Sequence, residues 1–165
     1  MNEEKVYYKD GVARVVDLLK DTFGDSFREY FNGDPAGIAE SQLPAIIVSE
    51  TEGTISSGAS GTDNITENIL IIVSLNKKDD FGAPNDTDLT EFKLRKLVKG
   101  QNVDGQYYPK TIMYALRKYI SMNDAVLRSE IATDFNVNQR GENLYTQEAY
   151  ISITIERLAI VPSRE

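Results

Sequence analysis

The sequence has 165 residues, a formal net charge of −8, no cysteine and no histidine. That length fits one domain, and a domain of this size buries about 70% of its unfolded surface without needing a disulfide or a metal. The missing residue types exclude thiolate nucleophiles, Ser–His–Asp and Cys–His catalysis and imidazole–zinc sites. Chemistry by carboxylates, lysine, tyrosine, arginine and hard cations stays open.

The charge pattern indicates neither nucleic-acid nor membrane binding. No long cluster of Lys and Arg is present, so we expect no basic face that grips a phosphate backbone. No apolar stretch approaches the ~20 residues that span a bilayer, and the polar segment 1–10 lacks the apolar region of a signal peptide. We predict one domain over residues 1–165 that is neither exported nor bound to a membrane.

The first expected element is a helix from about Lys9 to Phe31. Its apolar residues fall at helical spacing: Val12, Val15, Val16, Leu19 and Phe23. Gly24 interrupts the helix, and Ser26 and Glu29 have the spacing of a capping box, which predicts a short second helical turn up to Gly33. Pro35 then prevents the helix from continuing.

Two strands follow, over residues 43–52 and 64–76. In the second strand, Ile65, Ile69, Ile71, Val73 and Leu75 share one face with Glu67, whereas Leu70 and Ile72 join polar residues on the other face. The segment 55–63 between the strands is small, polar and rich in glycine. It cannot pack a core, so we expect a long, flexible hairpin tip there.

Two helices and a second hairpin complete the chain. Helix-start signals at residues 85–87 predict a helix to about Lys99, and Pro109 suits the first turn of the next one. The buried stripe of that helix is expected to be Ile112, Met113, Leu116, Tyr119 and Ile120. Alternating residues over 126–137 and 145–158, joined by a turn at 138–143, predict the closing hairpin.

The expected order is α-β-β-α-α-β-β. Two antiparallel hairpins separated by helices are typical of an α+β fold: a single, mainly antiparallel sheet with the helices packed on one face.

Three acidic clusters match parts of known catalytic or metal-binding patterns, but none meets the full requirements of its chemistry. Asp80-Phe81-Gly82 matches a kinase triplet without the rest of a kinase. Pro84-Asn85-Asp86 with Glu91-Phe92-Lys93 matches a nuclease pattern, but its second carboxylate falls in a predicted helix instead of a strand. An EF-hand loop that begins at Asp86 would have Leu97 where a bidentate Glu is required.

We therefore predict no catalytic residue, no cofactor, no metal site and no enzymatic activity. A remote alternative is a magnesium-dependent enzyme that uses Asp79, Asp80, Asp86 and Glu91.

The outward strand faces are partly apolar, which indicates a surface covered by a neighbouring subunit; the alternative is isolated surface hydrophobes, which are common. Leu70, Ile72, Tyr150 and Leu158 lie on these faces. Together with the hairpin tip they define a predicted interface, whose residues are Ser57, Gly58, Ser60, Gly61, Asp63, Leu70, Ile72 and Tyr150.

Four segments carry a family resemblance: residues 30–35 (YFNGDP), 43–48 (LPAIIV), 58–66 (GASGTDNIT) and 75–82 (LNKKDDFG). With the closing hairpin, they resemble the tail terminator (tail completion) proteins of tailed bacteriophages. The resemblance spans most of the chain, and none of the four segments is diagnostic alone.

The resemblance implies an α/β subunit that forms a hexameric ring on the tail tube, ends tube polymerisation and provides the surface that joins the head. Its partners would be further copies, the tail tube protein, neck or head-completion proteins and, in a contractile tail, the sheath. DNA would pass through the lumen without specific binding. The expected location is the tail or neck of the virion, and the host cytoplasm during assembly.

Other head–tail components are the alternatives: a stopper or adaptor, or a tail tube protein. Neck adaptors are often more helical, and tube proteins commonly form a β-sandwich, so the predicted helices favour a terminator.

Overall fold

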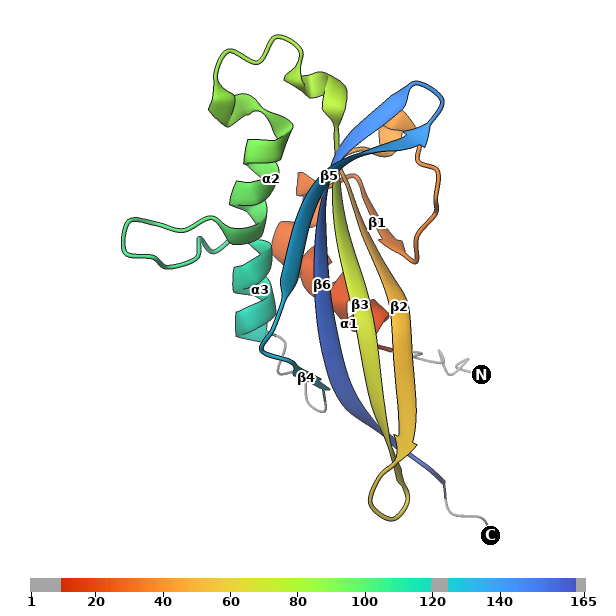
Figure 1. Cartoon of the computed structure of the whole chain (residues 1–165). Coiled ribbons are helices and arrows are strands. Elements are labelled where there is room, and N and C mark those ends of the chain that lie inside the picture. The colour runs from red at the N-terminus through yellow and green to blue at the C-terminus, as the bar shows by residue number, and fades with distance from the viewer. Residues whose placement is uncertain (1–9, 120–124, 163–165) are drawn as a thin grey trace, which may run out of the picture.

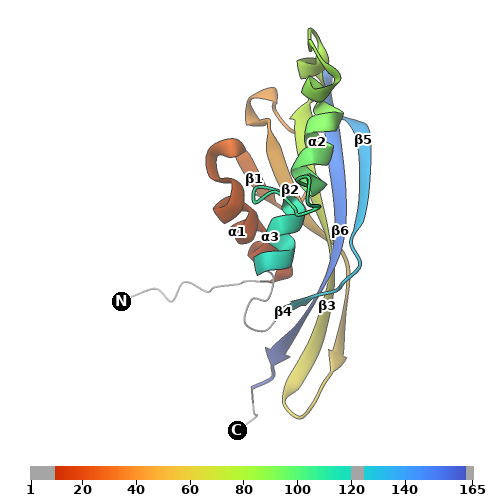
Figure 2. The ribbon, with the colours of Figure 1, turned by 90° about the vertical axis from the view of Figure 1, so that its left-hand side faces the viewer.

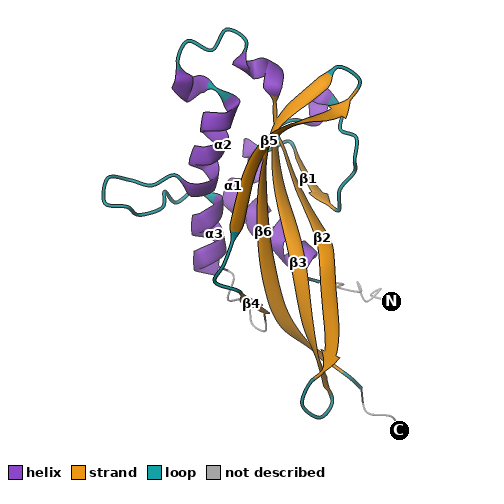
Figure 3. Cartoon of the chain, in the orientation of Figure 1, coloured by secondary structure: helices purple, strands orange, loops and turns teal. Residues whose placement is uncertain are grey.

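A mainly antiparallel mixed sheet and three α-helices make up the structure, a computed structural model that describes residues 10–119 and 125–162 (Figures 1 and 3). The helices are α1 (Gly11–Phe23), α2 (Thr90–Lys99) and α3 (Ile112–Tyr119). The strands are β1 (Glu29–Asn32), β2 (Ala45–Ser57), β3 (Thr62–Asn76), β4 (Ala125–Leu127), β5 (Ala132–Gly141) and β6 (Leu144–Ile160). The chain is therefore α+β, as predicted.

The sheet has six strands in the order β1-β2-β3-β6-β4, and β5 also pairs with β6. β1 runs parallel to β2, whereas the other pairs are antiparallel. The predicted order and the two-hairpin description are wrong in two places. β1 was not foreseen, and the single strand expected over 126–137 is divided into β4 and β5, which pair with different parts of β6.

All three helices lie on one face of the sheet (Figure 2). The main core fills the space between the helices and this face. The predicted apolar positions of α1 are buried in it, as are Ile69, Ile71 and Val73 of β3, whereas Leu75 is partly buried against it and Ile65 lies outside it. Asp10 accepts a hydrogen bond from the Ala13 N–H at 2.9 Å and so caps α1.

Glu67 is buried beside this core on β3 and fastens the start of α1. Its carboxylate accepts the Gly11 N–H at 3.2 and 3.3 Å and pairs with Arg157. A negative charge at this position also suits the positive end of the helix dipole.

The segment after α1 differs from its prediction. α1 ends at Phe23, a short 3₁₀ turn follows at Gly24–Ser26, and residues 29–32 form a strand where a helical turn was expected. Tyr30 packs against the main core whereas Phe31 packs on the opposite sheet face, so the side chains alternate as in a strand. Pairing with β2, including the Gly33 N–H to Val48 O bond at 2.7 Å, outweighs the local capping signal.

The connector, residues 33–44 between β1 and β2, lies against the outer face, the sheet face away from the helices. A second apolar cluster forms beneath it: Ile38, Leu43, Ala45, Ile47, Ile72 and Leu144. The connector includes a 3₁₀ turn at Glu40–Gln42. The outer face is therefore covered in part by the chain itself.

The last two helices begin later than predicted. α2 begins at Thr90, after 3₁₀ turns at Lys77–Asp80 and Asp86–Asp88, and α3 begins at Ile112. Ile112, Met113 and Leu116 are buried, as predicted. The Tyr119 side chain and Ile120 fall outside the described residues. Within residues 10–119 and 125–162 no helix is long and apolar enough to cross a bilayer.

Candidate assembly interface

The three longest strands continue past the helical layer as a distal arm, residues 53–66 and 156–161 (Figures 1 and 2). β3 is its middle strand, with β2 on one side and β6 on the other. Large apolar side chains are exposed on the arm: Ile55 is 70%, Leu158 51% and Ile160 83% exposed. Exposed apolar side chains that gather on one projection are typical of a contact surface.

The predicted hairpin tip lies at the end of this arm but is shorter than expected. Only residues 58–61 stay outside the strands, because Ser57 already pairs with Asp63. The turn is closed by the Gly58 N–H to Thr62 O bond at 3.0 Å, and Gly61 has a φ of +79°. The sequence signal of small polar residues was misread, since β-pairing supplies the backbone hydrogen bonds without a local core.

The three interface residues predicted on the outer face fall into two groups. Ile72 lies directly opposite Tyr150, but it is only 2% exposed because it belongs to the cluster under the connector. It therefore packs within its own chain. Leu70 and Tyr150 lie at the border of that cluster and are half-buried.

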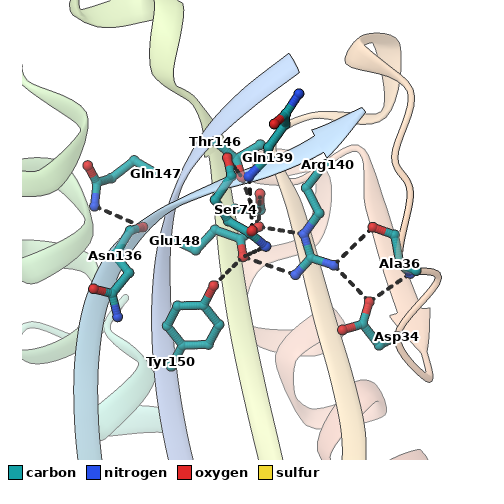
Figure 4. A network of polar contacts seen from close by, with 11 residues as sticks. Asp34, Ala36, Ser74, Asn136, Gln139, Arg140, Thr146, Gln147, Glu148 and Tyr150 are labelled. Atoms are coloured by element: carbon teal, nitrogen blue, oxygen red, sulfur yellow. Dashed lines mark hydrogen bonds and ion pairs between the residues drawn. The ribbon is translucent and has the colours of Figure 1, made fainter. Parts of the chain in front are cut away.

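Beside this border, a buried ion pair ties the sheet to the connector (Figure 4). The Glu148 side chain is fully buried and that of Arg140 is 4% exposed. Arg140 donates to Glu148 through Nε at 2.8 Å and Nη2 at 2.9 Å, and its Nη1 donates to Asp34 Oδ1 at 2.8 Å. The Ile38 N–H also donates to the Arg140 carbonyl at 3.2 Å, so one residue holds the connector through both backbone and side chain.

Four further groups donate to the Glu148 carboxylate, so that each oxygen accepts three hydrogen bonds. They are Ser74 Oγ, Thr146 Oγ1, Tyr150 OH and Asn138 Nδ2, at 2.9, 3.0, 2.6 and 3.2 Å. Burial would raise the pKa of Glu148, but these bonds and the Arg140 charge lower it below its usual value. Burial and the bond to Glu148 raise the pKa of Tyr150.

This network was not foreseen, because Asp34, Ser74 and Arg140 are far apart in the sequence and none is unusual in its local pattern. The alternation along β6 places Glu148 on the same face as Tyr150, the outer face. It is buried there because the connector covers it. With every donor satisfied and Glu148 fully buried, the arrangement fits a structural role, holding the connector, and offers no exposed acid or base.

The remote magnesium hypothesis finds no support in the positions of its carboxylates. No group of three or more acidic side chains in the described part of the chain is arranged to hold a metal ion. Asp80 accepts the Thr90 N–H at 2.7 Å and pairs with Lys77 at 2.6 Å, and so caps α2. Burial would raise the pKa of Asp80, but these two partners lower it.

A second exposed apolar surface lies at the end of the sheet opposite the distal arm. A groove of about 520 Å³ there has apolar walls from Phe81, Val137, Leu144 and Tyr145. Phe81 is 88%, Val137 54% and Tyr145 53% exposed. Both ends of the sheet therefore present apolar side chains to the solvent.

The overall negative charge conceals a basic segment of the chain that was not foreseen. Residues 90–119 contain seven basic and two acidic residues, a net charge of +5, whereas residues 1–89 contain seven basic and seventeen acidic residues. The basic side chains are exposed on α2, α3 and the loop between them: Lys93, Arg95, Lys96, Lys99, Lys110, Arg117 and Lys118. We call this surface the basic flank.

Four of these cations lie over aromatic rings: Arg95, Lys96, Lys99 and Lys118. Lys96 Nζ is 5.9 Å from the centre of the Tyr108 ring, and Lys99 Nζ is 5.7 Å from that of Phe135. Such contacts position a charge without neutralising it. Counting charges by segment instead of searching for a continuous basic run would have revealed the basic flank from the sequence.

No protein-family model matches the chain, and no curated protein sequence matches it.

Proposed function

We propose that the protein is a structural subunit of a phage virion, a tail terminator. Six copies form a ring that caps the tail tube, ends tail polymerisation and provides the surface that joins the head. This proposal rests on the resemblance of residues 30–35, 43–48, 58–66 and 75–82 to that family and on the surface of the structure.

The distal arm is the observation that carries the assembly function. Ile55, Leu158 and Ile160 are exposed on this arm, so they contribute nothing to the core of an isolated chain. The interface would include the tip residues Ser57, Gly58, Ser60, Gly61 and Asp63, and the Leu70–Tyr150 border. A partner that covers these side chains would gain roughly 25 cal/mol for each Å² of apolar surface removed from water.

The two apolar ends of the sheet suit a ring that lies between two other components. One end would meet the tail tube protein and the other a neck or head-completion protein, with the sheath as a further neighbour in a contractile tail. DNA would cross the lumen without specific binding, since the net charge is −8.

The architecture also bears on the alternatives. A single sheet with helices on one face differs from the β-sandwich common among tube proteins, which supports a terminator over a tube subunit. A stopper or adaptor is the other alternative, and it would occupy a different position in the neck.

The test combines mass with position. Native mass measurement should give six times the subunit mass of 18.5 kDa, and electron microscopy of tails incubated with labelled protein should place it at the head-proximal end of the tube. A protein that stays monomeric and leaves tubes uncapped would exclude the proposal. Binding at another position would favour a stopper or adaptor.

A further inference from the structure

An acidic surface lies on the side of the sheet opposite the basic flank. β1 and β2 form one edge of the sheet, whereas β5, beside α2, lies on the far side of β6. Glu29 lies on β1, Glu50 and Glu52 lie on β2, and the charge of Asp10, the N-cap of α1, acts on Glu50. We call this surface the acidic flank.

Two carboxylates of the acidic flank, those of Asp10 and Glu50, lie close enough to repel each other. The pKa of Glu50 is raised, first by burial and then by the negative charges of Glu67 and Asp10, and Arg157 offsets only part of this effect. A positive partner placed here would relieve the repulsion.

Each flank also carries exposed apolar groups. The loop 100–108 projects from the basic flank between α2 and α3 (Figure 1). It is held in a hairpin-like shape by the Asn102 N–H to Gln106 O bond at 2.9 Å and by bonds from the N–H groups of Asp104 and Gln106 to Asn102 Oδ1. At its tip Val103 is fully exposed. On the acidic flank, Ile55 of β2 is exposed.

We propose that the basic flank of one copy docks against the acidic flank of a second copy, with the 100–108 loop contacting β2. The inference rests on the ring proposed above and adds which two surfaces meet. The partner is a second copy because the same chain carries both charges, on opposite sides.

The placement of the charges also determines the symmetry. A two-fold dimer that buried one flank against itself would bring like charges together, which costs free energy. Contact between unlike flanks leaves one free flank at each end of the growing assembly, so association continues until the ring closes. Val103 and Ile55 would lie within the contact and the charges around it, as in other protein interfaces.

Charge reversal tests this contact. Lys96→Glu with Lys99→Glu places two acidic side chains on the basic flank and lowers the net charge of residues 90–119 from +5 to +1. Glu50→Lys with Glu52→Lys places two basic side chains on the acidic flank and changes the charge of its four positions from −4 to zero. Each variant alone should lose the assembled species in native mass and sedimentation measurements. An equimolar mixture should regain it, because the two variants can alternate around a ring with an even number of copies. Recovery also shows that both variants are folded.

The matched control reverses two exposed carboxylates that belong to neither flank. Asp79→Lys with Glu142→Lys changes the net charge as much as the acidic-flank variant does, and it should assemble like the wild type. Higher salt should weaken the wild-type assembly, because the charges are exposed and screened. Unchanged assembly in both single-flank variants, or no recovery on mixing, would overturn the inference, as would a wild type that stays monomeric in low salt.

Other outcomes separate this inference from the proposed function. Variants that still cap tail tubes would overturn the flank contact and leave the terminator function intact. A ring that depends on the charges but fails to cap tubes would support the flank contact and overturn the terminator function. Duplex DNA that binds the wild type and not the Lys96→Glu/Lys99→Glu variant, with assembly unaffected, would assign the basic flank to nucleic acid and overturn the docking.

Discussion

Arg140 and Glu148 form a two-bond ion pair across the β5–β6 hairpin, with N–O distances of 2.8 and 2.9 Å, and Glu148 is fully buried. Removing one partner of such a pair leaves the other charged and without compensation. We expect Arg140→Met to lower the free energy of unfolding by about 3–5 kcal/mol, measured by urea denaturation.

Arg128, which directly follows β4, provides the matched control. Its pair with Glu156 is exposed, with side chains 56% and 47% accessible. Arg128→Met should therefore cost less than about 1 kcal/mol. Equal losses in the two variants would show that burial does not determine the strength of the Arg140 pair.

The stability of the protein should fall at low pH in part because of Glu148. Its pKa in the folded state is lower than in the unfolded chain, so the unfolded state binds the proton first. The contribution of Glu148 to stability is present above the ordinary pKa of about 4.5. It is lost as the pH falls through the lower pKa of the folded state. Denaturation from neutral pH to about pH 3 should give a shallower slope for Glu148→Gln than for the wild type. Parallel slopes would contradict the assignment.

Asp80 should stabilise the start of α2 and should not bind a metal ion. Asp80→Ala removes the acceptor of the Thr90 N–H and should lower stability by about 1 kcal/mol. Asp79→Ala, at an exposed neighbouring position, should change stability by less than about 0.5 kcal/mol. Excess Mg²⁺ should leave the melting temperature of all three proteins unchanged. A magnesium-dependent rise that Asp80→Ala abolishes would restore the enzyme hypothesis.

The exposed side chains of the distal arm should contribute to assembly and not to folding. We expect Ile55→Ser with Ile160→Ser to change the free energy of unfolding by no more than about 0.5 kcal/mol for each site but to prevent tube capping. Ile153→Ser, at a position 2% exposed, should destabilise the chain itself. Normal capping by the arm variant would remove the arm from the proposed interface.

Periodicity alone predicted much of the fold. The apolar stripe of α1 and the alternating faces of β3 and β6 are local patterns, and the structure confirms them. The capping-box spacing of Ser26 and Glu29 misled the prediction, because the parallel pairing of β1 with β2 depends on residues far along the chain. The shortness of the β2–β3 turn likewise depends on pairing across strands.

The candidate interface was less predictable than the fold. Leu70 and Ile72 look alike in the sequence, yet the connector covers only Ile72, since that segment crosses the outer face at this point. The Arg140–Glu148–Asp34 group depends on contacts between distant segments. The basic flank was present in the sequence but hidden by the overall negative charge.

The path of the connector has a kinetic consequence. Asp34 and Arg140 are 106 positions apart, so the connector cannot reach its anchor until the β5–β6 hairpin has formed beside β3. Contacts of such long sequence separation form slowly, because the intervening chain must first be ordered. We therefore expect residues 33–44 to dock in the last step of folding, and their amides to exchange with solvent sooner than those of the strands beneath them.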